Sequence, residues 1–255
     1  MDGTFLRSDG TYDKCRFSRV HERLRAGAVR FAVVSGNQDV QLRSFFDDPQ
    51  EFAFVSDNGA MVVVDGTEVC GARMGAAVVD EVVSFLEEWA LPYIASGPGR
   101  AFAPAAAPTS FVSRMRRFYP LLETLESVGD VSDQIFKFAL SIPPEETSRF
   151  RRALHRRVGD AVIPVTSGHG ELDLGCPGVT KASGLDVVLR AWGVGWGEVA
   201  AFGDSANDLP MLRAAGVPVA MAGATDPVKA ACLVTTEAND DDGVLNQLER
   251  WFPET

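Results

Sequence analysis

The chain has 255 residues, enough for one large domain or two modest ones, and its 46% hydrophobic and 23% charged residues are typical of a soluble globular protein. Its formal net charge of −11 would repel phosphate backbones and anionic lipid surfaces, which argues against nucleic acid and membranes as partners. A small anion can still bind where a cation or backbone donors gather locally, so phosphorylated metabolites stay among the candidate ligands.

The cysteines and the N-terminus indicate the compartment. Cys15, Cys70, Cys176 and Cys232 are scattered and form no CxxC pair, which favours reduced structural thiols over a zinc or redox site. No apolar run approaches the roughly 20 residues of a membrane span, and the N-terminus lacks the basic-then-apolar pattern of a signal peptide. We therefore expect a cytoplasmic protein.

The first part of the chain alternates between helix and strand patterns. Apolar residues at helical spacing predict a helix over 17–28, and a short apolar run predicts a strand at 30–35. Two more strands are expected at 52–56 and 61–65, separated by the turn Asp57-Asn58-Gly59.

The last part repeats this alternation. Strands are predicted at 198–204, 217–221 and 232–236, and helices at 182–192, 207–215 and 226–231. Short apolar strands that alternate with helices indicate an α/β fold with a parallel, helix-covered sheet.

The middle of the chain has a different pattern. Helices are predicted at 79–90 and 144–158, strands at 134–140, 161–167 and 171–175, and an irregular loop over the Gly-, Pro- and Ala-rich segment 96–110. Because these elements do not alternate strictly, they predict an inserted α+β domain over 75–175. The core would then consist of 1–74 and 176–255, with chain crossings near Arg73 and Gly175.

Two carboxylates in FGDSANDLPML suggest a metal site. Asp204 directly follows a predicted strand, and Asp208 lies four residues later in the first turn of the next helix. Carboxylate oxygens at this edge of an α/β sheet suit a hard divalent cation. The alternative is a simple turn at Asp204, followed by a helix cap near Asn207 or Asp208.

Two further stretches could bind an anion. Ser35-Gly36-Asn37, after a predicted strand, offers a hydroxyl and backbone donors to a phosphate oxygen, although a plain loop would have the same pattern. Lys181 precedes an apolar helix, where the helix dipole opposes a cation unless an anion compensates it. A solvated surface lysine is the alternative.

Taken together in this order, DGTF at 2–5, VVSGNQ at 33–38, GVTKASGL at 178–185 and FGDSANDLPML at 202–212 resemble the haloacid dehalogenase superfamily, specifically its Cof-type phosphatases. In that family the first motif is Asp-x-Asp-Gly-Thr, whose first Asp is the nucleophile and whose second is the general acid/base. Asp2 matches the second Asp. The resemblance therefore implies that the nucleophile lies immediately upstream of Met1. An internal Met mistaken for the start, or a truncation, would explain why the sequence begins inside the motif. Loss of the nucleophile in the protein itself is the alternative.

The resemblance implies a role for each matching residue. Asp2 would protonate the leaving oxygen and then activate water, while Lys181 would neutralise the charge of nucleophile and phosphoryl group. Phosphate binding falls to Ser35, Gly36 and Asn207. The implied cofactor is Mg²⁺, held by Asp204, Asp208 and the Asp2 carbonyl. Asn37 departs from the arginine that the family often has after the Ser-Gly pair, which weakens any inference about the group bound there.

The spacing of the motifs locates the inserted domain. About 30 residues separate Thr4 from Ser35, which leaves no room for a domain, whereas well over 100 separate Ser35 from Lys181. An insertion after the second motif is the C2 cap arrangement of the family: a Rossmann-like parallel core with an α+β cap. Such a cap, closing over the site, favours a small phosphorylated metabolite, such as a sugar phosphate, as substrate.

Two other functions compete with a phosphatase. Gly203-Asp204-Ser205 also matches the GDS nucleophile of lipase-like hydrolases, but every histidine of the chain precedes that serine. A catalytically silent protein that binds a phosphorylated ligand or partner is the stronger alternative, because the chain contains no residue that matches the nucleophile.

Overall fold

The structure is a computed structural model that describes residues 1–168 and 171–254. The chain divides into two compact units, residues 1–33 with 188–255, and residues 34–187. We call them the outer-segment unit and the central unit. Helix α6 (Lys181–Trp192) runs from the central unit into the outer-segment unit, and β1 (Ala32–Val34) does the reverse. Among the described residues, no helix is long and apolar enough to span a membrane.

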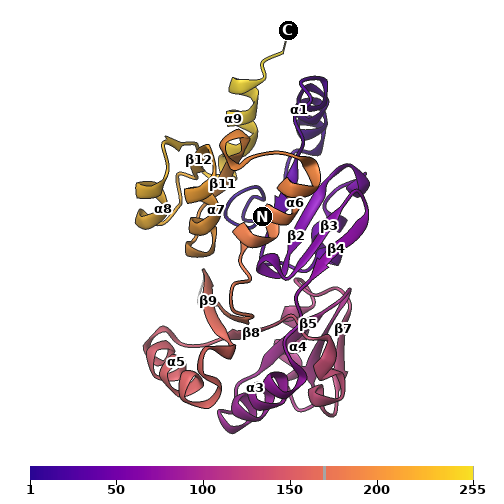
Figure 1. The fold of residues 1–255 in the computed structure, drawn as a ribbon, viewed down its shortest axis with the longest axis vertical. Helices are drawn as coiled ribbons and strands as arrows, with labels where there is room; N and C mark the ends of the chain where they lie inside the picture. Colours follow the sequence, from indigo (N-terminus) through magenta and orange to yellow (C-terminus); the bar gives the residue numbers. More distant parts are fainter. Residues whose placement is uncertain (169–170, 255) are drawn as a thin grey trace. The chain divides into compact units, whose positions relative to one another are not determined.

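The outer-segment unit contains a parallel sheet of order β11-β12-β13. Its strands are β11 (Ala200–Gly203), β12 (Val217–Ala220) and β13 (Val234–Thr235), and its helices are α1 (Lys14–Ala26), α7 (Leu209–Ala214), α8 (Asp226–Ala231) and α9 (Gly243–Trp251). Figure 1 shows α7 and α8 beside β11 and β12. This confirms the predicted α/β class and its parallel strands.

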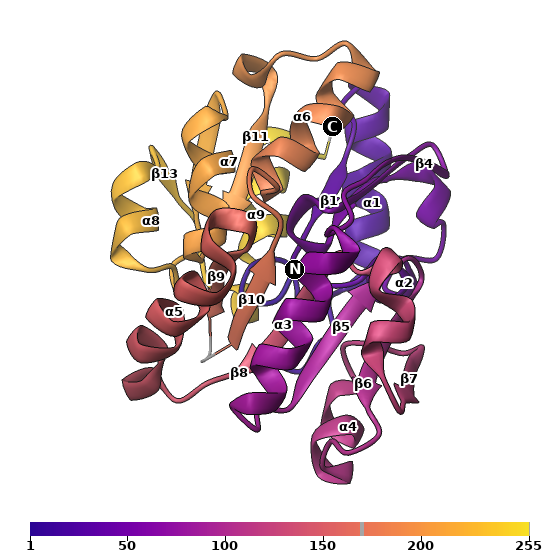
Figure 2. The ribbon, with the colours of Figure 1, turned by 60° about the horizontal axis from the view of Figure 1, so that its bottom comes forward.

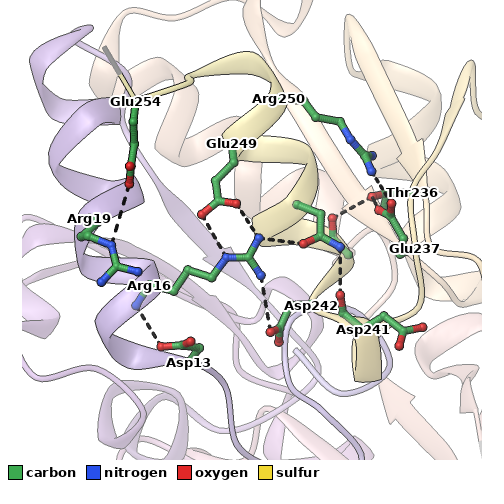
Figure 3. Close-up of polar contacts among 12 residues, drawn as sticks. Asp13, Arg16, Arg19, Thr236, Glu237, Asp241, Asp242, Glu249, Arg250 and Glu254 are labelled. Carbon is green, nitrogen blue, oxygen red and sulfur yellow. Dashed lines mark hydrogen bonds and ion pairs between the residues drawn. The ribbon is translucent and has the colours of Figure 1, made fainter.

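Polar side chains join the two ends of this unit. Arg16 of α1 donates to Glu249 of α9 at 2.9 and 2.5 Å and to Asn246 at 2.7 Å. Its guanidinium also lies 3.6 Å from the Asp242 carboxylate, so Arg16 stands among groups from both sides of the α9 N-terminus (Figure 3). The bidentate pairing with Glu249 is the strong form of such a contact, so it fixes α9 against α1.

The central unit begins with a sheet of order β1-β2-β3-β4. It contains β2 (Ala53–Ser56), β3 (Met61–Val64) and β4 (Thr67–Gly71), which pair antiparallel, and the short helix α2 (Asp39–Ser44). The predicted turn Asp57-Asn58-Gly59 is confirmed as the connection between β2 and β3. The sequence analysis did not predict β4, because its first three residues are exposed and show no apolar alternation.

A six-stranded sheet of order β7-β6-β5-β8-β10-β9 forms the rest of the central unit. Its strands are β5 (Tyr93–Gly97), β6 (Arg100–Pro104), β7 (Leu122–Leu125), β8 (Lys137–Ser141), β9 (Ile163–Gly168) and β10 (Glu171–Gly175), and its helices are α3 (Ala76–Glu88), α4 (Thr109–Met115) and α5 (Pro144–Val158). Figure 2 shows α3 and α5 on one side of these strands.

This sheet is buried on both faces. In β5, Tyr93 and Ala95 pack in the apolar cluster that includes α3 and α5, whereas Ile94 packs in a second cluster with α4. The larger cluster runs along the chain from Met74 to Cys176. The domain boundaries at 75 and 175 stay a prediction, and the division into compact units falls at 33/34 and 187/188 instead.

The predicted irregular loop at 96–110 is wrong in part. β5 and β6 form a hairpin that turns at Gly99, whose φ is +67°, and α4 begins at Thr109. The Gly- and Pro-rich composition marked the turn correctly. It concealed the strand that follows, in which Ala101 and Phe102 are buried on opposite faces.

Candidate active site

The Asp2-Gly3-Thr4 segment forms a tight loop in the outer-segment unit. The Met1 carbonyl accepts hydrogen bonds from the backbone N–H groups of Thr4, Phe5 and Leu6, at 3.2, 2.8 and 3.0 Å. Gly3 has a φ of +70°, a conformation that favours glycine. The sequence therefore folds back on itself at the position where the family motif places its catalytic loop.

Asp204 lies against this loop. The Thr4 hydroxyl donates to Asp204 Oδ1 at 2.5 Å, and a Cβ added to Gly3 would lie 2.7 Å from Asp204 Oδ2. Only glycine lets the backbone approach the carboxylate so closely. Residues that are 200 positions apart are thus brought together, as the motif resemblance implied for the Asp2 loop and Asp204.

Asp208 shapes the loop that carries Asp204. Its Oδ2 accepts the backbone N–H groups of Asp204 and Ser205, each at 3.0 Å, and the residue is 3% exposed. Together with Ser205 it forms a capping box at the short helical turn of residues 206–208. These bonds agree with the helix-cap interpretation, and they also fix the Asp204 backbone, so direct metal coordination by Asp208 stays a prediction.

The carboxylate oxygens of Asp204 suit a hard cation. Its two carboxylate oxygens accept hydroxyl donors from Thr4 and Ser205, at 2.5 and 2.6 Å, and each oxygen keeps further lone pairs. Mg²⁺ prefers oxygen ligands from one or two carboxylates together with water and substrate phosphate. Within residues 1–168 and 171–254, no three His, Cys, Asp or Glu side chains gather into a metal cage, which is compatible with such a sparsely liganded ion.

The central unit contains the other candidate residues. Ser35 directly follows β1 and is 3% exposed; its N–H donates to Val55 O in β2 at 2.8 Å. The Asn37 N–H donates to Ser35 Oγ at 3.1 Å, so Ser35-Gly36-Asn37 closes into a small side-chain turn. We call these three residues the phosphate-binding loop, after their predicted role.

The Asp57-Asn58-Gly59 turn connects this loop to the start of α6. Asn58 N–H donates to Ser35 O at 3.0 Å, and a Cβ on Gly59, with φ of +103°, would lie 2.1 Å from Thr180 O. Lys181 follows Thr180 as the first residue of α6 and is 7% exposed. This burial argues against the solvated surface-lysine alternative, and the anion-binding role of Lys181 stays a prediction.

The predicted site residues thus fall into two groups. Asp2, Asp204, Asn207 and Asp208 belong to the outer-segment unit, where the Asp2 loop and Asp204 are in contact. The other group, Ser35, Gly36 and Lys181, belongs to the central unit and is connected through the turn at 57–59. The first group contains oxygen atoms that could bind a cation and the second contains donors that could bind an anion, and these roles stay predictions.

A buried charge network in the central unit was missed by the sequence analysis. Lys137 Nζ lies 3.0 Å from Asp173 Oδ2 and 3.8 Å from Asp57 Oδ1, and all three side chains are at most 7% exposed. Ser96 Oγ donates to the same Asp57 oxygen at 2.9 Å. A lysine within the fully buried run Ile135, Phe136 and Phe138 is the signal that could have revealed it.

Asp57 in this network predicts a pH dependence of stability. Burial raises its pKa to about 7, against the attraction of Lys137 and the Ser96 hydrogen bond, while Asp173 and Asp39 add repulsion. Because the folded state holds this proton more tightly than the unfolded chain, the contribution of Asp57 to the unfolding free energy falls as pH rises from about 4 to about 7, by up to a few kcal/mol.

Replacement of this residue should remove that slope. Asp57→Asn keeps a residue that tolerates the φ of +49° but does not titrate, so its stability relative to wild type should increase between pH 5 and pH 7.5 in urea denaturation. Asp65→Asn is the matched control, since Asp65 has a φ of +50° in an exposed turn. Parallel stability curves for Asp57→Asn and wild type over this pH range would contradict the prediction.

The fold and motifs agree with a comparison against known families. The chain matches the haloacid dehalogenase-like hydrolases over residues 1–248 and belongs to that family. Within it, the chain is a Cof-type phosphatase with an α/β core and a cap, as the resemblance implied.

Individual relatives support this assignment. The chain is 36% identical over 255 residues to 5-amino-6-(5-phospho-D-ribitylamino)uracil phosphatase YbjI of Escherichia coli K12, covering 98% of this chain and 93% of the relative. A phosphatase of the same name, YitU of Bacillus subtilis, is 43% identical over 75 residues, 29% of this chain and 28% of that one. The crystal structure of SMU.1108c from Streptococcus mutans UA159 has a TM-score of 0.93 at 30% identity and covers 100% of this chain and 97% of its own.

Proposed function

We propose that this chain is a cytoplasmic, Mg²⁺-dependent phosphomonoesterase that acts on a small phosphorylated metabolite, with neither nucleic acid nor membrane as partner. The observation that carries the proposal is the contact of Asp204 with the Asp2-Gly3-Thr4 loop, through the Thr4 hydroxyl and the close approach of Gly3. It joins the first and last motifs of a phosphatase family around carboxylate oxygens.

The motif match assigns a role to each group of the chain. Asp204, Asp208 and the Asp2 carbonyl would hold Mg²⁺, which when bound offsets the negative charge of the phosphoryl oxygens. Asp2 would give a proton to the leaving oxygen and take one from water. The Ser35 hydroxyl, the Gly36 backbone and Asn207 would bind phosphate oxygens, and the Lys181 ammonium would reduce the repulsion between two anions.

The same match supports a position for the attacking carboxylate. Asp2 aligns with the second Asp of Asp-x-Asp-Gly-Thr and Met1 with the x, so we propose that the nucleophile is the residue immediately before Met1. That residue would be bonded directly to Met1, whose carbonyl anchors the loop. We use "extended protein" for the chain preceded by an apolar strand ending in that Asp.

The names of two relatives support a proposal for the substrate class. Both relatives named above act on a phosphorylated ribityl chain attached to a pyrimidine, and we propose a substrate of that kind, a polyol phosphate, as the first to test. This specifies more closely the sugar-phosphate class expected from the sequence. A partly buried Asp204 that would hold Mg²⁺ makes no distinction between phosphomonoesters, so the part of the substrate beyond the phosphate would determine selectivity.

The experiment is a substrate panel with the extended protein. We expect kcat/KM for 5-amino-6-(5-phospho-D-ribitylamino)uracil to exceed that for ribose 5-phosphate and for an aryl phosphate by at least about tenfold. Chelation of Mg²⁺ should reduce every rate at least about a hundredfold, and added Mg²⁺ should restore it. Equal rates with and without chelator would refute metal dependence, and no hydrolysis of any phosphomonoester would refute the function.

A further inference from the structure

Lys137 of β8 is a buried lysine whose partners lie in three separate stretches of the chain. Its side chain is 4% exposed, and an ammonium group removed from water must be compensated by charge and hydrogen bonds. Burial alone would lower the pKa of Lys137, but attraction to Asp173, Tyr119 and Asp57, together with the Asp173 hydrogen bond, outweighs burial and raises the pKa. The lysine is therefore charged inside the protein.

One of its partners is the carbonyl of the phosphate-binding loop. Lys137 Nζ donates to Gly36 O at 2.6 Å, a shorter contact than the 3.0 Å to Asp173. That carbonyl belongs to the same peptide unit as the Asn37 N–H, which points the opposite way and donates to Ser35 Oγ at 3.1 Å. A cation on the carbonyl thus fixes the plane of this peptide and polarises its N–H.

The fixed orientation of this peptide affects the direction of the Ser35 hydroxyl. Because Ser35 Oγ accepts the Asn37 N–H, its own hydrogen must point toward a different acceptor. In the proposed function, that acceptor is a phosphate oxygen. Lys137 therefore controls the direction of the donor that Ser35 presents to the substrate, although it does so through the Gly36–Asn37 peptide rather than by its own contact.

The Asp57-Asn58 turn connects the same network to the loop a second time. Asn58 Nδ2 donates to Asp173 Oδ2 at 2.6 Å, and the backbone N–H groups of Asn58 and Asp57 donate to Ser35 O and Asn37 O, each at 3.0 Å. Both turn residues have positive φ values, +49° and +58°, which cost energy outside glycine. This backbone strain, together with buried charge, is typical of a segment held for function.

The geometry points to Lys137 as a positioning residue of the phosphate-binding loop, with Asp173 as the counter-ion that holds the ammonium against the Gly36 carbonyl. This inference rests on the proposed phosphatase function. It adds a residue from the inserted stretch to the machinery that orients the phosphate.

The test begins with the 255-residue protein carrying Lys137→Met, which keeps most of the side-chain volume and removes the donor. Amide exchange at Asn37, measured by NMR, should become at least about tenfold faster, because the peptide loses its anchor. Binding of inorganic phosphate in the presence of Mg²⁺, measured by calorimetry, should weaken at least about tenfold. Wild-type exchange at Asn37 in the variant would overturn the inference.

Two variants separate positioning from general stability. Phe138→Leu, at the next position of β8, should lower the melting temperature while Asn37 exchange and phosphate affinity stay at their wild-type values. Lys137→Met with Asp173→Asn removes both members of the Lys137–Asp173 ion pair and leaves Asp57, so its melting temperature should recover relative to the single variant. If the double variant also regains phosphate affinity and slow exchange, the network is only structural and the inference is wrong.

Steady-state kinetics of the extended protein provide the third test of the role of Lys137. Lys137→Met should raise KM about as much as it weakens phosphate binding and should in addition lower kcat at least about tenfold, because the misdirected hydroxyl would weaken the transition state more than the ground state. Equal changes in the Phe138→Leu control would contradict this. If wild-type protein neither binds phosphate nor hydrolyses phosphomonoesters, the proposed function fails, and Asn37 exchange still decides whether Lys137 holds the loop.

Discussion

The extended protein is expected to hydrolyse phosphomonoesters at least about a thousandfold faster than the 255-residue chain when both are assayed with Mg²⁺. In the proposed mechanism the 255-residue chain lacks the attacking carboxylate and forms no aspartyl-phosphate for Asp2 to hydrolyse, so Lys181 would contribute only to substrate binding. The added residues should also raise the melting temperature, because they would add a strand to the sheet directly before Met1.

The control is an extension that ends in Asn instead of Asp. It should give the same gain in melting temperature without the gain in rate, which separates the chemistry from folding. Equal activity in the 255-residue and extended proteins would show that another residue attacks phosphorus. Inactivity in both, with phosphate binding intact, would favour the catalytically silent binding protein.

Asp204→Asn in the extended protein is expected to reduce kcat/KM by roughly a thousandfold, about 4 kcal/mol of transition-state stabilisation. The amide keeps the size of the side chain and one oxygen for the Thr4 hydroxyl, but it removes the charge that would hold Mg²⁺. Affinity for Mg²⁺, measured by calorimetry in the absence of substrate, should fall with the rate.

Asp226→Asn is the matched control, because Asp226 is an exposed acid at the start of α8 in the same unit. It should leave both the rate and the Mg²⁺ affinity unchanged. A wild-type rate in Asp204→Asn would remove Asp204 from the metal site, and a lost rate with unchanged Mg²⁺ affinity would assign it a different role.

The sequence predicted the parts of the fold in which local pattern and burial coincide. The strands β11 and β12 were found because parallel strands buried on both faces consist of continuous apolar residues. The approach of the Asp2-Gly3-Thr4 loop to Asp204 was expected as well, because the family resemblance places the Asp2 carbonyl near Asp204; the Thr4 hydrogen bond itself was not predicted. In these places the residues that form the buried strand or the loop contact are the same residues that form the recognisable sequence pattern.

The apolar run around Lys137 could have indicated a buried lysine, but its partners could not be predicted because they depend on strand register. Lys137 and Asp173 lie on β8 and β10, and they approach because Leu174 pairs with Phe138 in the antiparallel ladder. Nothing in the local sequence of either strand specifies that register. The hydrogen bond to Gly36 spans 101 positions and also depends on the turn at 57–59. The sequence predicted that turn but not its backbone geometry.

The most direct test of the account is a rapid-mixing measurement on the extended protein with Asp2→Asn and p-nitrophenyl phosphate. This substrate has a good leaving group, so the attack that forms the aspartyl-phosphate needs little help from Asp2, whereas the second step requires Asp2 to activate water. The account predicts a burst of about one nitrophenol per enzyme, followed by slow turnover, with a phosphate group on the Asp before Met1. A variant that releases nitrophenol slowly from the first turnover, and carries no covalent phosphate, would contradict it.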